Sequence, residues 1–271
     1  MSTDPKSTMA DVFEGRVLVV EDEEVNRLVA RGIMMPLGID PEFATNGAEA
    51  IEKTDAGDYD LILMDVQMPG MSGVEAAIQI RERERAEGRN RIPIAALTAN
   101  ATEGDRVRCM EAGMDGFMAK PLMRSVLIDT FTRWLGAQGT TSEQTGAVPP
   151  AQAGSILDGE SLVALKASMG GGVASLRLVL ESFQESLVRL PADISNAGQS
   201  GDVEAMVRAA HSLKSNSAVA GALDLSALCA RLETKMRAGD TAMASSLILE
   251  IEKEVGRVKL ALTTELDSIP K

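Results

Sequence analysis

Aromatic side chains are scarce in this sequence of 271 residues: they make up 3% of it, with one tryptophan and one tyrosine. Sites that stack bases or sugars on aromatic rings are therefore not expected. Basic residues are also in the minority, with 27 lysines and arginines against 40 aspartates and glutamates. The formal net charge of −13 argues against a surface for nucleic acid or an anionic membrane, since both attract basic patches.

Cysteine and long apolar runs are nearly absent as well. Cys109 and Cys229 lie far apart and form no Cys-x-x-Cys pair, which is typical of small buried side chains in a reducing compartment. Residues 1–15 lack the apolar core of a signal peptide. No apolar run approaches the roughly 20 residues that a membrane span needs. We expect a cytoplasmic protein with no membrane contact.

The first half of the chain alternates between strand and helix patterns. Short apolar runs predict strands at "RVLVV" (16–20), "EFAT" (42–45), "DLILMD" (60–65), "IPIAALT" (92–98) and "GFMA" (116–119). Helical patterns follow each of them, the last being "LMRSVLIDTFTRWL". Five strands that alternate with five helices predict an α/β fold, a parallel, doubly wound, flavodoxin-like sheet.

The second half of the chain differs in composition and in its hydrophobic pattern. Residues 136–155 are rich in Gly, Ser, Thr and Pro and predict a flexible linker. Helical periodicity then runs from about 158 to 266, with breaks at glycines, and predicts an antiparallel four-helix bundle. We therefore expect a tail at 1–14, an α/β domain at 15–135, the linker at 136–155 and an all-α domain at 156–268.

Polar side chains stand at the ends of the predicted strands: Glu21, Asp22, Asp65, Thr98 and Lys120. The carboxyl ends of parallel strands meet at one edge of a sheet, so we expect these side chains to gather there. Clustered carboxylates repel one another and favour a cation, and oxygen ligands suit Mg²⁺. The hydroxyl and the ammonium would bind phosphoryl oxygens, and an aspartate beside Mg²⁺ can attack phosphorus. Taken alone, the aspartate after "LILM" fits a simple strand end with an Asx turn equally well.

The lone histidine lies in "RAAHSLKSNSAVAGA" (208–222), which reads as a helix. One stripe of that helix is apolar or small and predicts the core face: Met206, Ala210, Leu213, Ser217 and Ala220. A second stripe carries Arg208, His211, Lys214, Ser215 and Ala218. A single histidine is more often structural than catalytic, but this stripe predicts an exposed imidazole away from the core.

An exposed imidazole with a lysine one helical turn later favours phosphoryl acceptance. The ring nitrogen would attack phosphorus while the Lys214 ammonium offsets phosphate charge. The small side chains of Ser215 and Ala218 would leave room for another protein to approach. A metal site at His211 is not expected, because the sequence has no second histidine and no cysteine cluster.

Residues 15–135 resemble the receiver domain of bacterial two-component response regulators. The motifs that carry the resemblance are "VLVVEDEEVNR", "DLILMDVQMPGMSG", "IPIAALTANA" and "GMDGFMAKP". The resemblance implies that Asp65 is the phosphoacceptor. It also implies that Asp22, Asp65 and the Gln67 carbonyl coordinate Mg²⁺, with Glu21, where the family more often has aspartate, helping through water. Thr98 and Lys120 would hold the phosphoryl group, and Phe117 would be a switch residue that turns inward.

Residues 156–266 resemble a histidine phosphotransfer (HPt) domain, a four-helix bundle. The motif "AHSLKSNSAVAGA" matches the family's His-x-Leu-Lys-Gly-x-Ser pattern, and "LCARLETKMRAGD" fits further along. The resemblance implies that His211 is phosphorylated and that Lys214 steadies the phosphoryl group. Ser215 stands where the family usually has glycine, so partner choice or transfer rate is expected to differ. The expected docking face carries Arg208, Ser215 and Ala218.

Together the resemblances predict a bacterial phosphorelay protein, similar to the receiver–HPt part of hybrid sensor kinases. Its partners would be a histidine kinase or hybrid kinase and other receiver domains, with a possible receiver–HPt contact inside the chain. No Gly-rich phosphate loop or kinase signature is present, so we expect a phosphotransfer protein rather than an enzyme that uses ATP. An alternative is an allosteric binding module, switched by phosphorylation, that regulates a kinase or the HPt domain without relaying phosphate. A passive scaffold, with Asp65 and His211 both dispensable, is the third possibility.

Overall fold

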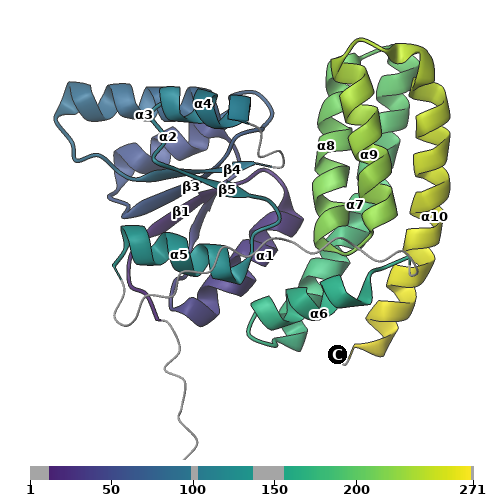
Figure 1. Cartoon of the computed structure of the whole chain (residues 1–271), viewed down its shortest axis with the longest axis horizontal. Helices are drawn as coiled ribbons and strands as arrows, with labels where there is room; N and C mark the ends of the chain where they lie inside the picture. The colour runs from purple at the N-terminus through teal and green to yellow at the C-terminus, as the bar shows by residue number, and fades with distance from the viewer. Residues whose placement is uncertain (1–11, 99–102, 137–155, 270–271) are drawn as a thin grey trace, which may run out of the picture.

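A computed structural model describes residues 12–98, 103–136 and 156–269 of the chain. It forms two parts that lie side by side, an α/β part and a helical bundle (Figure 1). Residues 99–102, which end the motif "IPIAALTANA", lie outside the described residues, as do most of the predicted tail and nearly all of the predicted linker.

The α/β part is built on one parallel sheet, as predicted. Its strands are β1 (Val17–Val20), β2 (Glu42–Ala44), β3 (Leu61–Asp65), β4 (Ile94–Thr98) and β5 (Gly116–Ala119). The strand order is β2-β1-β3-β4-β5, and every neighbouring pair is parallel. In the register of this sheet Asp65 lies opposite Leu97 and Thr98 lies opposite Ala119. The polar ends of β3 and β4 therefore reach the same edge.

Helices cover both faces of the sheet (Figure 1). They are α1 (Glu24–Met34), continued by the 3₁₀ turn η1 (Met35–Leu37), α2 (Gly47–Ala56), α3 (Gly73–Glu87), α4 (Glu103–Glu111) and α5 (Arg124–Trp134). Alternate strand residues enter two separate cores, because successive side chains of a strand point to opposite faces. Val17 and Val19 pack in the core that α1 and α5 cover, whereas Leu18 and Val20 pack in the core under the other helices.

The bundle contains one short helix, α6 (Gly159–Ser168), and four long ones. The long helices are α7 (Val173–Ser200), α8 (Val203–Val219), α9 (Leu223–Arg237) and α10 (Ala244–Ser268), with the 3₁₀ turn η2 (Thr241–Met243) before the last. The chain turns at Gly201, Gly221 and Gly239, whose φ angles of 73° to 75° lie in the left-handed region that favours glycine. Among the described helices, none combines the length and apolar character that a membrane crossing requires.

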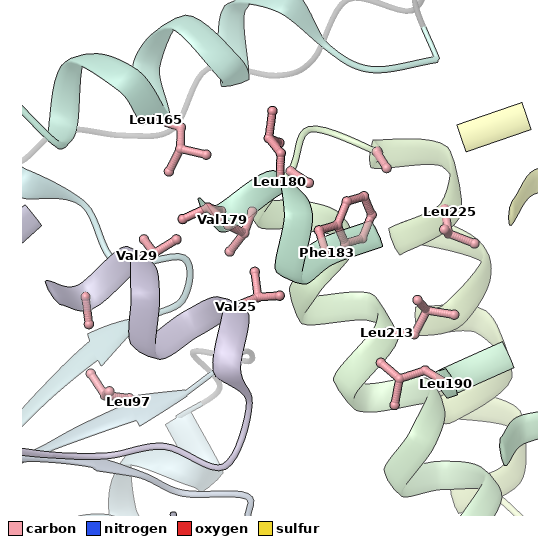
Figure 2. Close-up of a cluster of buried hydrophobic side chains, with 14 of the residues drawn as sticks. Val25, Val29, Leu97, Leu165, Val179, Leu180, Phe183, Leu190, Leu213 and Leu225 are labelled. Atoms are coloured by element: carbon pink, nitrogen blue, oxygen red, sulfur yellow. The ribbon is translucent and has the colours of Figure 1, made fainter. Parts of the chain in front are cut away.

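Helix α1 joins the two parts. Its buried apolar residues belong to one continuous hydrophobic cluster that also contains the interior of the bundle. Figure 2 shows Val25 and Val29 on one side of this junction and Val179 and Leu180 of α7 on the other, all of them at most 3% exposed. The bundle is therefore packed directly against the helix that follows the first strand.

Candidate functional site

Three carboxylates gather at the carboxyl edge of the sheet, as predicted. Glu21 and Asp22 follow β1, and Asp65 is the last residue of β3. One oxygen atom from each lies within 4.8 Å of the others. Glu21 and Asp65 are 2% and 3% exposed, and Asp22 is partly buried. The arrangement concentrates negative charge in a place that water reaches poorly.

Lys120 supplies the nearest positive charge. Its Nζ atom lies 2.6 Å from Oδ2 of Asp65 and 2.5 Å from Oε2 of Glu21. Burial alone would lower the pKa of Lys120, but these two carboxylates outweigh burial and raise it above its ordinary value. The lysine therefore carries its charge throughout the physiological range and sits directly against the predicted phosphoacceptor.

One lysine does not balance three carboxylates. Burial and the neighbouring charges of Glu21 and Asp65 raise the pKa of Asp22 to about 7. The pKa of Glu21 is also raised, mainly by burial. A divalent cation would relieve this repulsion, and an all-oxygen donor set is what Mg²⁺ prefers. Gln67, whose carbonyl was predicted as a ligand, is at the same edge: its N–H donates to Oδ1 of Asp65 at 3.0 Å. The residues present therefore fit the metal.

The two remaining predicted residues of this edge lie on β4 and β5. Thr98 ends β4 and is 4% exposed. Phe117 is half-buried and packs against the core beneath α2, α3 and α4. It lies opposite Ala96 in the register, two residues before the pair of Thr98 with Ala119 at the carboxyl edge.

The prediction that His211 is exposed is wrong. The residue is 9% exposed, and its Nδ1 atom lies 3.0 Å from Oε1 of Glu233 on α9. It is not part of the hydrophobic interior, because its side of α8 opens onto a cavity of about 970 Å³. The core stripe, by contrast, is confirmed, with each of its five members at most 3% exposed. The histidine loses exposure because α9 and the α/β part lie beside its stripe of the helix.

Glu233 is a buried contact of His211 that the sequence did not reveal. Its Oε2 accepts from Nζ of Lys214 at 2.6 Å, and its Oε1 accepts from Nη2 of Arg237 at 2.9 Å. Burial raises the pKa of Glu233, but the contacts with His211 and Lys214 outweigh burial and lower it to about 2. The glutamate lies within the motif "LCARLETKMRAGD", so the only signal for it was that resemblance.

The cavity brings the two predicted phosphoacceptor regions together. Asp22 and Gln67 line it from the sheet edge, and His211 and Arg237 line it from the bundle. Nη2 of Arg237 lies 3.4 Å from Oε1 of Gln67, which links the two sides directly. His211 and two residues beside Asp65, Asp22 and Gln67, therefore face a shared space.

The three predicted docking residues differ in exposure and in their contacts. Ser215 is 8% exposed, and its Oγ accepts a hydrogen bond from Nδ2 of Asn26 on α1 at 3.3 Å. Ala218 is half-buried. Arg208 is exposed, lines the cavity and pairs with Glu204 of its own helix at 2.8 Å. Of the three, Ser215 contacts the α/β part through a hydrogen bond.

Comparison with protein families matches both parts. Residues 17–132 match the family model of the response regulator receiver domain, and residues 176–261 match that of the Hpt domain. The chain combines a receiver domain with an Hpt domain. The two resemblances drawn from the motifs are thereby confirmed, and so is the fold class of each domain.

Relatives with curated descriptions are sensor kinases. The receiver–Hpt chain is 28% identical over 263 residues to the sensor histidine kinase GacS of Pseudomonas protegens, which covers 94% of this chain and 28% of that protein. It is 36% identical over 123 residues to hybrid signal transduction histidine kinase L of Dictyostelium discoideum, covering 44% of this chain and 7% of that protein. The chain thus spans about a quarter or less of these relatives.

A solved structure aligns with the receiver part of the chain. The receiver domain of sensor histidine kinase PA1611 from Pseudomonas aeruginosa is 38% identical, with a TM-score of 0.41, and the match covers 45% of this chain and 98% of that one.

Proposed function

We propose that this chain is a phosphorelay protein that carries phosphoryl groups on Asp65 and on His211 and exchanges them between the two. The observation that carries the proposal is the shared cavity, which the edge around Asp65 and the face of His211 line from opposite sides. Transfer between two nucleophiles requires each to be within reach of the same phosphorus atom. The receiver domain is assigned to residues 15–135 and the Hpt domain to 156–268.

On the receiver side, an oxygen of Asp65 attacks the phosphorus of a phosphohistidine. An O–P bond forms, the N–P bond breaks, and the released imidazole takes up a proton. Mg²⁺ held by Asp22, Asp65 and the Gln67 carbonyl, with Glu21 acting through water, would neutralise phosphoryl charge when bound. Lys120 already lies 2.6 Å from Asp65 and would transfer its contact to a phosphoryl oxygen, together with the Thr98 hydroxyl.

On the Hpt side, Glu233 orients the nucleophile. An ionised carboxylate only accepts hydrogen bonds, so its contact with Nδ1 of His211 assigns the proton to Nδ1 and leaves the lone pair on Nε2. Nε2 would then be the atom that attacks phosphorus. Glu233 also holds Lys214 beside the ring, where its ammonium would offset phosphoryl charge. Reverse transfer uses the same groups.

The chain's partners follow from its parts. A receiver and an Hpt domain accept and pass on phosphoryl groups, so the phosphoryl group would arrive from a histidine kinase or hybrid kinase. Other receiver domains would exchange with His211. We propose a bacterial, cytoplasmic protein that uses no ATP itself.

A second function is favoured by the docking of α1 against α7 and α8. Phosphorylation of Asp65 could shift Thr98 and Phe117 and change the affinity of the receiver domain for the Hpt domain, which requires the two states to differ in that affinity. Beryllofluoride, a mimic of the phosphoryl group, would then alter the domain separation measured by X-ray scattering. An unchanged separation disfavours this function.

The relay is tested with acetyl phosphate and Mg²⁺ as phosphodonor. Wild type should carry alkali-labile label on Asp65 and acid-labile label on His211. Asp65→Asn should carry neither, while the matched variant His211→Gln should keep the Asp65 label. Label that reaches His211 at the full rate in Asp65→Asn would overturn the route through Asp65.

A further inference from the structure

Two polar side chains of α1 and its N-cap meet two adjacent polar side chains of α8. Asn26 donates to Oγ of Ser215 at 3.3 Å, and Nδ2 of Asn216 donates to Oε2 of Glu23 at 3.1 Å. All four residues are at most 9% exposed. The contact is therefore a buried polar patch between the receiver and Hpt domains.

Asn26 has a second partner within the receiver site. The same Nδ2 atom donates to Oε1 of Glu21 at 2.8 Å. A side-chain amide has two N–H donors, so one is held by the acidic cluster and the other is directed to the Hpt domain. The position of the donor that meets Ser215 is thus fixed by the receiver's own carboxylate.

Ser215 stands where the Hpt motif usually has glycine. This substitution changes which receiver side chains can face that position. A glycine has no polar atom to satisfy and tolerates many partners. A buried hydroxyl that faces an aliphatic side chain loses its hydrogen bond to water without replacement, which disfavours that complex roughly 5- to 150-fold. Asn26 provides a donor to the hydroxyl oxygen of Ser215.

We infer that Asn26 and Ser215 form a specificity-determining pair that selects this chain's own receiver domain for its Hpt domain. The inference rests on the proposed relay. Receivers with a hydrogen-bond donor at the position of Asn26 dock well, whereas receivers with an aliphatic side chain there dock poorly. Specificity arises from a group that a wrong partner leaves unpaired.

The first test is a double-mutant cycle in the full chain, with Asp65 labelled by acetyl phosphate and Mg²⁺. Ser215→Ala and Asn26→Leu should each slow the appearance of label on His211 roughly 5- to 50-fold relative to label already on Asp65. The double variant should be slowed no more than Asn26→Leu alone, because either replacement already breaks the hydrogen bond between the domains and the donor to Glu21 is lost with Asn26 in both. Ser246→Ala and Asn90→Ala, at exposed positions, are the matched controls and should be silent.

The second test measures partner choice. A chain carrying Asp65→Asn is labelled on His211 with phosphoramidate and mixed with an isolated foreign receiver domain that has leucine at the position of Asn26. Ser215→Ala should speed this transfer more than transfer to the same foreign domain with asparagine at that position, because release of the chain's own receiver affects both alike, and it should slow transfer from the chain's own receiver. A structural defect in the bundle would slow both.

Equal slowing with both receivers, or additive effects in the double variant, would overturn the inference while leaving the relay intact. No change in either assay on Ser215→Ala would overturn it too. If wild type forms no phosphohistidine from Asp65, the proposed relay itself fails, and the phosphoramidate assay still reports on the pair.

Discussion

Nδ1 of His211 lies 3.0 Å from Oε1 of Glu233, across the boundary between α8 and α9. Glu233 is 4% exposed and also accepts hydrogen bonds from Lys214 and Arg237, so one carboxylate holds three polar side chains together. The imidazole is consequently held in one orientation, which a nucleophile aimed at a phosphorus atom requires.

Replacing this carboxylate should weaken transfer without unfolding the bundle. We expect Glu233→Ala to reduce phosphorylation of His211 about 10- to 100-fold, as is seen when the orienting partner of a metal-bound histidine is lost. Glu233→Gln keeps a carbonyl acceptor and should retain more activity. ¹⁵N chemical shifts of the ring report the tautomer directly. A ring that stays protonated on Nδ1 in Glu233→Ala would show that Glu233 does not orient it.

Magnesium should stabilise the protein more at pH 8 than at pH 6. The pKa of Asp22 is raised to about 7 from 3.8, so the folded metal-free protein binds more protons than the unfolded chain between these values. Its free energy of unfolding therefore falls as pH rises through that window. A cation offsets the charge once Asp22 is ionised. Thermal unfolding with and without Mg²⁺ at both pH values measures the difference, and Asp22→Asn should abolish it.

Gly73 leaves no room for a side chain. A Cβ atom there would lie 1.9 Å from the backbone oxygen of Asp65, so the end of strand β3 would have to move. We expect Gly73→Ala to cost about 1–3 kcal/mol of stability and to impair labelling of Asp65. Gly159→Ala is the matched control, because a Cβ atom there meets no atom within 4 Å. Denaturant unfolding and acetyl phosphate labelling of both variants measure these effects. If Gly73→Ala has the same free energy of unfolding and the same labelling as wild type, the close packing at Gly73 is contradicted.

Phe183 fills the interior of the bundle and is 0% exposed (Figure 2). Truncation to alanine removes buried contacts and leaves a cavity, so Phe183→Ala should lower the free energy of unfolding by about 3–5 kcal/mol. Leu260→Ala, at a position that is 73% exposed on α10, should change it by less than about 0.5 kcal/mol. Urea titration followed by circular dichroism compares the two. Equal losses would show that the face bearing Leu260 is covered in solution.

The receiver edge was predictable because its chemistry follows from local rules. Asp65 and Thr98 come directly after apolar runs, and the carboxyl ends of parallel strands meet at one edge whatever the loops do. The alternation of strand and helix patterns therefore sufficed to place them together. The metal-site prediction needed only residue type and strand position.

The environment of His211 could not be predicted in the same way. Helical periodicity separates one stripe of α8 from another, but it does not say which neighbour covers a stripe. Glu233 reaches His211 from the next helix, and Asn26 reaches Ser215 across 189 positions of sequence. Such contacts depend on how helices and domains pack, so the burial of the imidazole and the role of Glu233 emerged only from the structure.

Helix α1 packs against both the sheet and the bundle, which matters when the two domains are separated and studied alone. Val25 and Val29 are covered partly by the sheet and partly by α7. A fragment containing the receiver residues alone would therefore expose this hydrophobic patch of α1 to water. Such a fragment should self-associate or bind detergent. Biochemists who divide this chain at the domain boundary would then be studying a surface that the intact protein keeps hidden.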